Sequence, residues 1–159
     1  METAVIVIVA LAVFAGVFYF ATNKARSNET LVEGSLLVKS SNPLDDIQKR
    51  IPENKVYVEQ RLYAGNDSKN SYIAIMSAEI TRGLALRGLN VSVYAIVQGG
   101  ENVCPEGVCS GARIVVAVGG CNCIYFNDTQ IVVEGDEKFL GDQAVRTGRL
   151  IGYAVYKRS

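Results

Sequence analysis

The sequence predicts an N-terminal transmembrane helix followed by a small three-layer α/β sandwich with a mixed sheet. Three observations carry this prediction: an uncharged apolar run at the start of the chain, strand and helix patterns that alternate after it, and a length of 159 residues that suits one domain. We divide the chain into a transmembrane anchor at residues 1–21, a polar linker at residues 22–30 and a single α/β domain at residues 31–159.

The predicted anchor spans Ala4 to Ala21, where no residue is charged and Ile, Val, Ala, Leu and Phe predominate. At about 1.5 Å per residue, a helix of this length spans roughly 27 Å, close to the ~30 Å thickness of the hydrocarbon core of a bilayer. Phe18, Tyr19 and Phe20 lie where an interfacial aromatic belt is expected. A buried core helix or a cleaved signal peptide is the alternative, but the basic n-region and the A-x-A-like cleavage site of a signal peptide are missing. We therefore expect residues 4–21 to contact membrane lipid as an uncleaved single-pass anchor.

Two signals disagree about the side of the membrane on which the domain lies. Lys24 and Arg26 follow the apolar run directly, which favours a cytoplasmic domain by the positive-inside rule. Four cysteines and several N-x-[ST] sequons favour an exported, glycosylated domain in an oxidising compartment. Because the sequon at Asn90 begins a predicted strand, we take three others as the glycosylation candidates: Asn28, Asn66 and Asn127. We predict a domain outside the cytoplasm.

Composition excludes several classes of function. Sixteen basic residues balance sixteen acidic ones, so the chain is not a strongly basic nucleic-acid-binding protein. The chain has no histidine, which excludes Ser-His-Asp and Cys-His catalysis and metal sites that contain histidine. We predict no catalytic residues and expect no nucleic-acid partner.

The first part of the domain reads as strand, helix and strand. Leu31 to Lys39 predicts one strand. Asn42 followed by Pro43 predicts the start of a helix that ends at Pro52. In the next strand, Lys55 to Leu62, apolar residues at 56, 58 and 62 alternate with Tyr, Glu and Arg at 57, 59 and 61, which indicates one covered face. Residues 64–70 are polar and predict a loop.

A central helix follows, for which Ser71 is the expected N-cap and Gly88 the expected C′ residue. Its apolar face consists of residues at helical spacing: Ile73, Met76, Ile80 and Leu84. Glu79 and Arg82 form an expected exposed pair on this helix.

The second half of the domain reads as four strands and a helix. Val91 to Val97 predicts a strand, and Arg113 to Val118 predicts one that is covered on both faces. Cys123 to Phe126 and Gln130 to Glu134 predict a hairpin, which we expect to add antiparallel strands at one edge. Residues 136–157 predict a terminal helix, although residues 149–156 fit a strand equally well because glycines interrupt the pattern. Glycines at 148 and 152 permit close helix packing within the domain.

The chemically distinctive stretch contains four cysteines in two pairs, Cys104 with Cys109 and Cys121 with Cys123. Disulfides are one interpretation. The turn at residues 105–107 would bring Cys104 and Cys109 together, whereas an extended chain holds Cα atoms two residues apart about 6.5–7 Å from each other, which makes Cys121 and Cys123 the poorer pair. Cross-pairing is equally compatible with the sequence. A four-thiolate zinc or iron–sulfur site and free, partly buried thiols are the other interpretations.

Two further patterns have ordinary structural explanations. Gly119 and Gly120 end an apolar strand, but no phosphate-binding glycine motif or helix follows them. Neighbouring carboxylates at 45–46 and at 136–137 lie where helices are expected to start, so capping and the helix dipole account for them.

Two hypotheses about function follow from the sequence. In the first, the chain is a non-enzymatic, membrane-anchored domain outside the cytoplasm that acts in binding or in envelope structure. In the second, it is a cytoplasm-facing metal or thiol-redox protein that uses its four cysteines. The sequence does not identify a protein partner or predict a cofactor in the first case.

Overall fold

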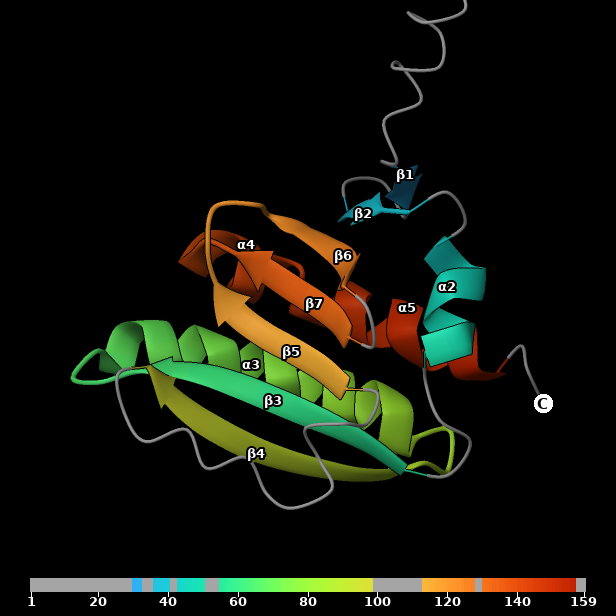
Figure 1. Cartoon of the computed structure of the whole chain (residues 1–159), viewed down its shortest axis with the longest axis horizontal. Helices are drawn as coiled ribbons and strands as arrows, with labels where there is room; N and C mark the ends of the chain where they lie inside the picture. Colours follow the sequence, from blue (N-terminus) through green and yellow to red (C-terminus); the bar gives the residue numbers. More distant parts are fainter. Residues whose placement is uncertain are drawn as a thin grey trace, which may run out of the picture.

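The protein is a mixed α/β domain, which confirms the predicted class (Figure 1). The structure is a computed structural model and describes residues 30–32, 36–40, 43–50, 55–98, 113–127 and 130–156. The predicted anchor at residues 4–21 and the linker lie outside the described residues. No described helix combines the length and the apolar character needed to cross a membrane.

Six strands build the main sheet, and a three-residue strand, β1, adds to one edge. The order across the sheet is β1-β2-β6-β7-β5-β3-β4. Strands β3, β4, β5 and β7 run parallel to one another, whereas β6 is antiparallel to β7 and parallel to β2. The bounds of the strands are as follows: β1 Thr30–Val32, β2 Leu36–Lys39, β3 Lys55–Tyr63, β4 Asn90–Gln98, β5 Arg113–Val118, β6 Cys123–Asn127 and β7 Gln130–Gly135.

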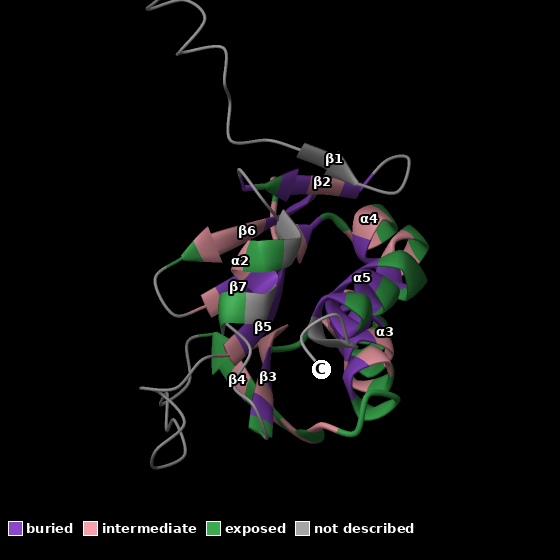
Figure 2. Ribbon diagram, turned by 90° about the vertical axis from the view of Figure 1, so that its right-hand side faces the viewer, coloured by how far each residue is buried: buried purple, intermediate pink, exposed green. Residues whose placement is uncertain are grey.

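Four described helices pack with this sheet: α2 Pro43–Arg50, α3 Asp67–Ala85, α4 Glu137–Asp142 and α5 Ala144–Tyr156. Each contributes buried side chains to a single hydrophobic core, as Ile47, Ile73, Leu140 and Ile151 illustrate. The strands meet this core through one face only. The described residues therefore form two layers, with α3, α4 and α5 along one side of the sheet, whereas α2 overlaps the sheet in the same view (Figure 2).

The prediction of three layers is therefore wrong for the part of the chain that the structure describes. It rested on the alternation of strands and helices along the chain, which does not determine on which face of the sheet each helix packs. The separate expectation that residues 113–118 are covered on both faces concerns β5. In the structure, β5 lies between β3 and β7, and residues on both of its faces are buried, but against different kinds of side chain. Ile114 and Val116 join the helix-covered core, whereas Val115 and Ala117 are buried on the opposite face, among the polar side chains described below.

Two strand predictions need correction. The single strand expected over Leu31 to Lys39 is two strands, because β1 pairs antiparallel with β2, Leu31 opposite Leu37, and the chain reverses between them. The hairpin of β6 and β7 exists, but it lies inside the sheet, because β7 pairs with β5 and β6 pairs with β2. Hairpin pairing is a local property, whereas the position of a hairpin in the sheet depends on distant strands.

The helices agree better with the pattern. Helix α3 begins at Asp67 rather than after Ser71, because the side chain of Asn66 accepts a hydrogen bond from the N–H of Lys69 and caps the helix earlier. Gly88 has φ +78°, as a glycine after a helix end requires. The terminal segment is helical through residue 156, which decides between the two interpretations of residues 149–156.

Helices α3 and α5 approach closely through glycines. A Cβ on Gly83 would clash with the backbone of Gly148, and a Cβ on Gly148 would clash with the backbone of Glu79. Gly152 packs on the backbone of Gly83 in the same way. The glycines at 148 and 152 therefore serve helix packing within the domain, as expected from the sequence.

Candidate functional site

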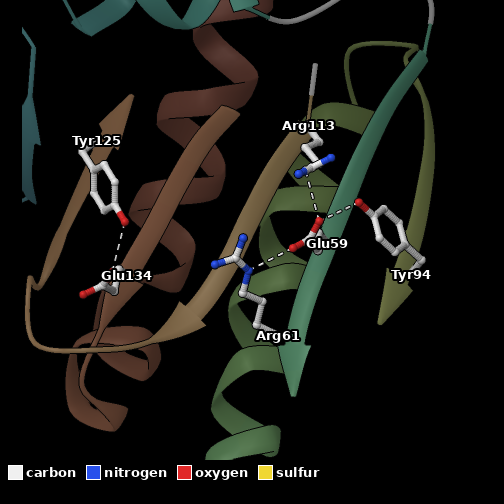
Figure 3. A network of polar contacts seen from close by, with 6 residues as sticks. All are labelled: Glu59, Arg61, Tyr94, Arg113, Tyr125 and Glu134. Carbon is white, nitrogen blue, oxygen red and sulfur yellow. Dashed lines mark hydrogen bonds and ion pairs between the residues drawn. The ribbon is translucent and has the colours of Figure 1, made fainter. Parts of the chain in front are cut away.

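The face of the sheet that points away from the helices carries a network of polar side chains, which we call the polar face (Figure 3). Its members come from five strands, β3 to β7, which lie side by side in the sheet in an order that differs from their order in the sequence. Because side chains alternate along a strand, each member lies on the side opposite the hydrophobic core. The polar face consists of Glu59, Arg61, Tyr94, Arg113, Tyr125 and Glu134.

Glu59 is the centre of the first half of the polar face and is only 2% exposed. Its carboxylate accepts a hydrogen bond from Nε of Arg61 at 2.9 Å and lies 3.1 Å from Nε of Arg113. Tyr94, directly opposite on β4, donates its hydroxyl to the same carboxylate at 2.7 Å. A buried carboxylate is costly unless it is paired and hydrogen-bonded, and Glu59 is both.

The arginines around Glu59 differ in their contact with solvent. The side chain of Arg113 is 13% exposed, and the Gln130 side-chain amide on β7 lies against its guanidinium group. Arg61 is 42% exposed. Arg113 is therefore a structural partner of Glu59, whereas Arg61 bridges the buried network and the surface.

The hydroxyl of Tyr94 remains a hydrogen-bond donor because its pKa is raised. Burial of the side chain raises the pKa of Tyr94 far above its ordinary value, and the hydrogen bond to the Glu59 carboxylate raises it further. The phenol therefore stays protonated at physiological pH, and its proton remains directed at Glu59.

A second pair, Tyr125 on β6 and Glu134 on β7, continues the polar face. The hydroxyl of Tyr125 donates to the Glu134 carboxylate at 3.1 Å, and the backbone N–H of Cys121 donates to the other oxygen at 3.3 Å. Burial and the charge of Glu134 raise the pKa of Tyr125. The Glu134 side chain occupies the space that a Cβ on Gly119 would take, so a larger residue there would displace the Glu134 carboxylate.

Cys121 and Cys123 are joined by a disulfide at the end of the polar face. We expected these residues to be the poorer pair because an extended chain separates them too far. The chain is not extended here: Asn122 has φ +51°, and the Cα atoms of the two cysteines are 5.2 Å apart. Asparagine tolerates this left-handed conformation better than most residues, which makes the turn possible.

The disulfide turn is tied to the start of α4. The side chain of Asn122 donates to Asp136 at 3.1 Å and accepts from the backbone N–H of Asp136 at 2.7 Å. The other carboxylate oxygen of Asp136 caps α4 by accepting from the N–H of Phe139 at 2.7 Å. That N–H lowers the pKa of Asp136, and the Asn122 side chain lowers it further. The capping role expected of the carboxylates at 136–137 is thus confirmed for Asp136.

The structure places only some of the residues that the sequence suggested as sites. Cys104, Cys109 and Asn28 lie outside the described residues. Asn66 caps α3 through its side chain, and Asn127 is exposed at the end of β6. Within the described part of the chain, no group of three or more His, Cys, Asp or Glu side chains is arranged to hold a metal ion. In the disulfide, neither Cys121 nor Cys123 offers a thiolate ligand.

The polar face is not among the sites predicted from the sequence. The only signal was the alternation of residues 57, 59 and 61 in β3, which indicated a solvent-facing side. That Glu59 meets Tyr94 and Arg113 depends on the strand order β4-β3-β5, which a single sequence does not reveal.

No protein-family model, no curated protein and no solved structure matches this chain significantly.

Proposed function

We propose that this chain is a non-enzymatic binding module that a membrane anchor at residues 1–21 holds outside the cytoplasm. The Cys121–Cys123 disulfide is the observation that carries this proposal. Disulfides persist in oxidising compartments and are rare in the reducing cytosol. The sequons and the additional cysteines of the sequence support the same side of the membrane.

The chemistry of the polar face favours binding over catalysis. The single negative charge of Glu59 is compensated by Arg61 and Arg113, and the pKa values of Tyr94 and Tyr125 are shifted upward, away from neutral pH. A general acid or base works best with a pKa near the operating pH. A rigid network that presents one exposed guanidinium group, that of Arg61, suits a module that binds hydrogen-bond acceptors on a partner.

Thiol labelling on intact cells of the native host tests this placement. Cells are treated first with a membrane-impermeant reductant and then with a membrane-impermeant maleimide, and the mass of the peptide that contains Cys121 and Cys123 is measured. We expect labelling only after reduction, and equal labelling in permeabilised cells. Labelling that requires permeabilisation would contradict the proposed side of the membrane. Recovery of the intact full-length chain in the soluble fraction would contradict the anchor.

The alternative is a cytoplasm-facing metal or thiol-redox protein, which Lys24 and Arg26 after the apolar run favour. In that case the four cysteines would be recovered reduced from intact cells. Zinc or iron would then copurify in proportion to the chain and be released by thiol alkylation. The same labelling experiment therefore separates the two functions.

A further inference from the structure

Strand β4 forms one edge of the sheet that the structure describes (Figure 1). Among the described strands, it has a neighbour on one side only. All nine of its residues pair in register with β3, so the strand is regular and has no bulge. The opposite edge of the sheet ends in β1, which has only three residues.

The sequence of β4 lacks the usual protection of an edge strand. Proteins protect edges with short strands, bulges, proline or charged side chains, especially lysine. From Asn90 to Gln98 the strand contains no proline and no charged residue. Two of its valines are substantially exposed, Val93 at 48% and Val97 at 43%. They lie on the helix side of the sheet, because Val93 pairs with the core residue Val58.

A groove of about 400 Å³ lies beside this edge, between α3 and the strands β3 and β4. The α3 side of the groove carries the small residues Ala74, Ser77 and Ala78 together with Thr81 and Arg82, and the strands contribute Gln60 and Val93. The small residues of α3 leave room next to the exposed side chain of Val93. A strand that adds to β4 would place the side chains of its helix-facing side beside this groove.

We propose that β4 is a dimer interface at which a second copy of this chain adds its own β4 in antiparallel orientation. A two-fold axis through Tyr94 would bring together residues whose numbers sum to 188, twice the number of Tyr94. This register pairs apolar residues with apolar residues on the helix side and amide with amide at the ends: Val91 with Val97, Val93 with Ala95, and Asn90 with Gln98. A two-fold interface must be self-complementary, and β4 meets that requirement.

The absence of charge on β4 favours a second copy over another partner. In a two-fold pairing, a charged residue near the axis would approach its own copy, and like charges directly opposite destabilise a sheet. A foreign strand imposes no such restriction, since it could supply the opposite charge. A nine-residue edge strand without any charge is therefore suited to pairing with itself.

The test measures the mass of the full-length chain, purified in a mild detergent, by light scattering with correction for the micelle. We expect the wild-type chain at twice its monomer mass at micromolar concentration, and V93K/V97K at the monomer mass. The matched control is Val145→Lys, because Val145 is equally exposed, at 43%, but lies on α5. This variant should remain dimeric. A monomeric wild-type chain, or a V93K/V97K variant that stays dimeric, would overturn the proposal.

Hydrogen exchange of the wild-type chain provides a measurement that needs no variant. Exchange of the β4 amides should slow as the chain concentration rises, while exchange in the β1 and β2 region should stay constant. Dimerisation that leaves β4 exchange unchanged would place the interface elsewhere and overturn the proposal. Association with a different protein from the host membrane, in a preparation whose own chain stays monomeric, would do the same.

Discussion

Replacing Glu59 by glutamine tests whether the polar face holds the sheet together. Glutamine keeps the shape of the side chain and removes its charge, which leaves Arg113 without its carboxylate partner in a site where that arginine is 13% exposed. Loss of one partner from a buried ion pair costs about 3–5 kcal/mol. Because Arg61 is 42% exposed and can turn to water, we expect the lower end of that range, about 3 kcal/mol.

The assay is urea unfolding of the full-length chain in detergent, followed by tyrosine fluorescence because the chain has no tryptophan. With an m-value of about 2 kcal/mol per M, the midpoint should fall by roughly 1.5 M without a change in m. The control is Glu79→Gln on α3, where the carboxylate lies 3.4 Å from Arg82 in an exposed pair. Such pairs contribute about 0–1 kcal/mol, so the control should unfold nearly as the wild type does. If Glu59→Gln and the control unfold alike, the network does not stabilise the domain and our account of the polar face is wrong.

Three further outcomes are expected. Gly148→Ala should lower the free energy of unfolding by about 1–3 kcal/mol, because its new Cβ meets the backbone of α3. Gly141→Ala on α4 is the control and should be close to neutral. Equal effects of the two variants in denaturant titrations would contradict the close packing of α3 and α5. In an absorbance titration, Tyr94 and Tyr125 should ionise at a higher pH than an ordinary phenol. Because the pKa values of both tyrosines are raised in the folded chain, their contribution to stability is complete below about pH 10 and is lost as the pH rises above it. A titration in which all tyrosines of the chain ionise together would refute this prediction. Asn122→Ala should destabilise the fold by about 1–3 kcal/mol in thermal unfolding, because it removes hydrogen bonds and places alanine at a φ of +51°. Asn122→Gly should recover the part of the loss that is due to φ. Equal destabilisation by the two variants would contradict this reasoning.

Local elements could be predicted from the sequence because their causes are local. Pro43 begins α2 and Gly88 follows α3, since each residue favours the backbone conformation found there. The start of α3 was misplaced because Ser71 was taken as the cap, whereas the side chain of Asn66 caps the helix earlier in the chain. Ser71 instead donates its hydroxyl to the backbone oxygen of Asp67 inside the helix.

What the sequence could not predict depends on contacts between distant segments. The polar face requires β3 to lie between β4 and β5, and the internal place of the hairpin requires β7 to pair with β5. The Cys121–Cys123 disulfide was misjudged for a different reason. The distance between the cysteines was taken from an extended chain, while the left-handed backbone of Asn122 draws the two Cα atoms together to 5.2 Å.

The sheet has two surfaces that differ in charge, the polar face and the β4 edge, and the two would bind partners in different ways. On the polar face, Glu59 and Glu134 are already engaged by partners of the same chain, so a ligand there meets a preformed set of hydrogen-bonding groups rather than unpaired charge. In the dimer that we propose, recognition at the β4 edge would rest on main-chain hydrogen bonds and on the exposed valines Val93 and Val97. Binding at the polar face should still weaken with salt where the ligand contacts Arg61, because this guanidinium group is 42% exposed and its charge is screened. Pairing at β4 involves no charged side chain of that strand, so it should persist under the same conditions. The two proposals are therefore compatible: a dimer formed along the β4 edge would leave the polar face available to another partner.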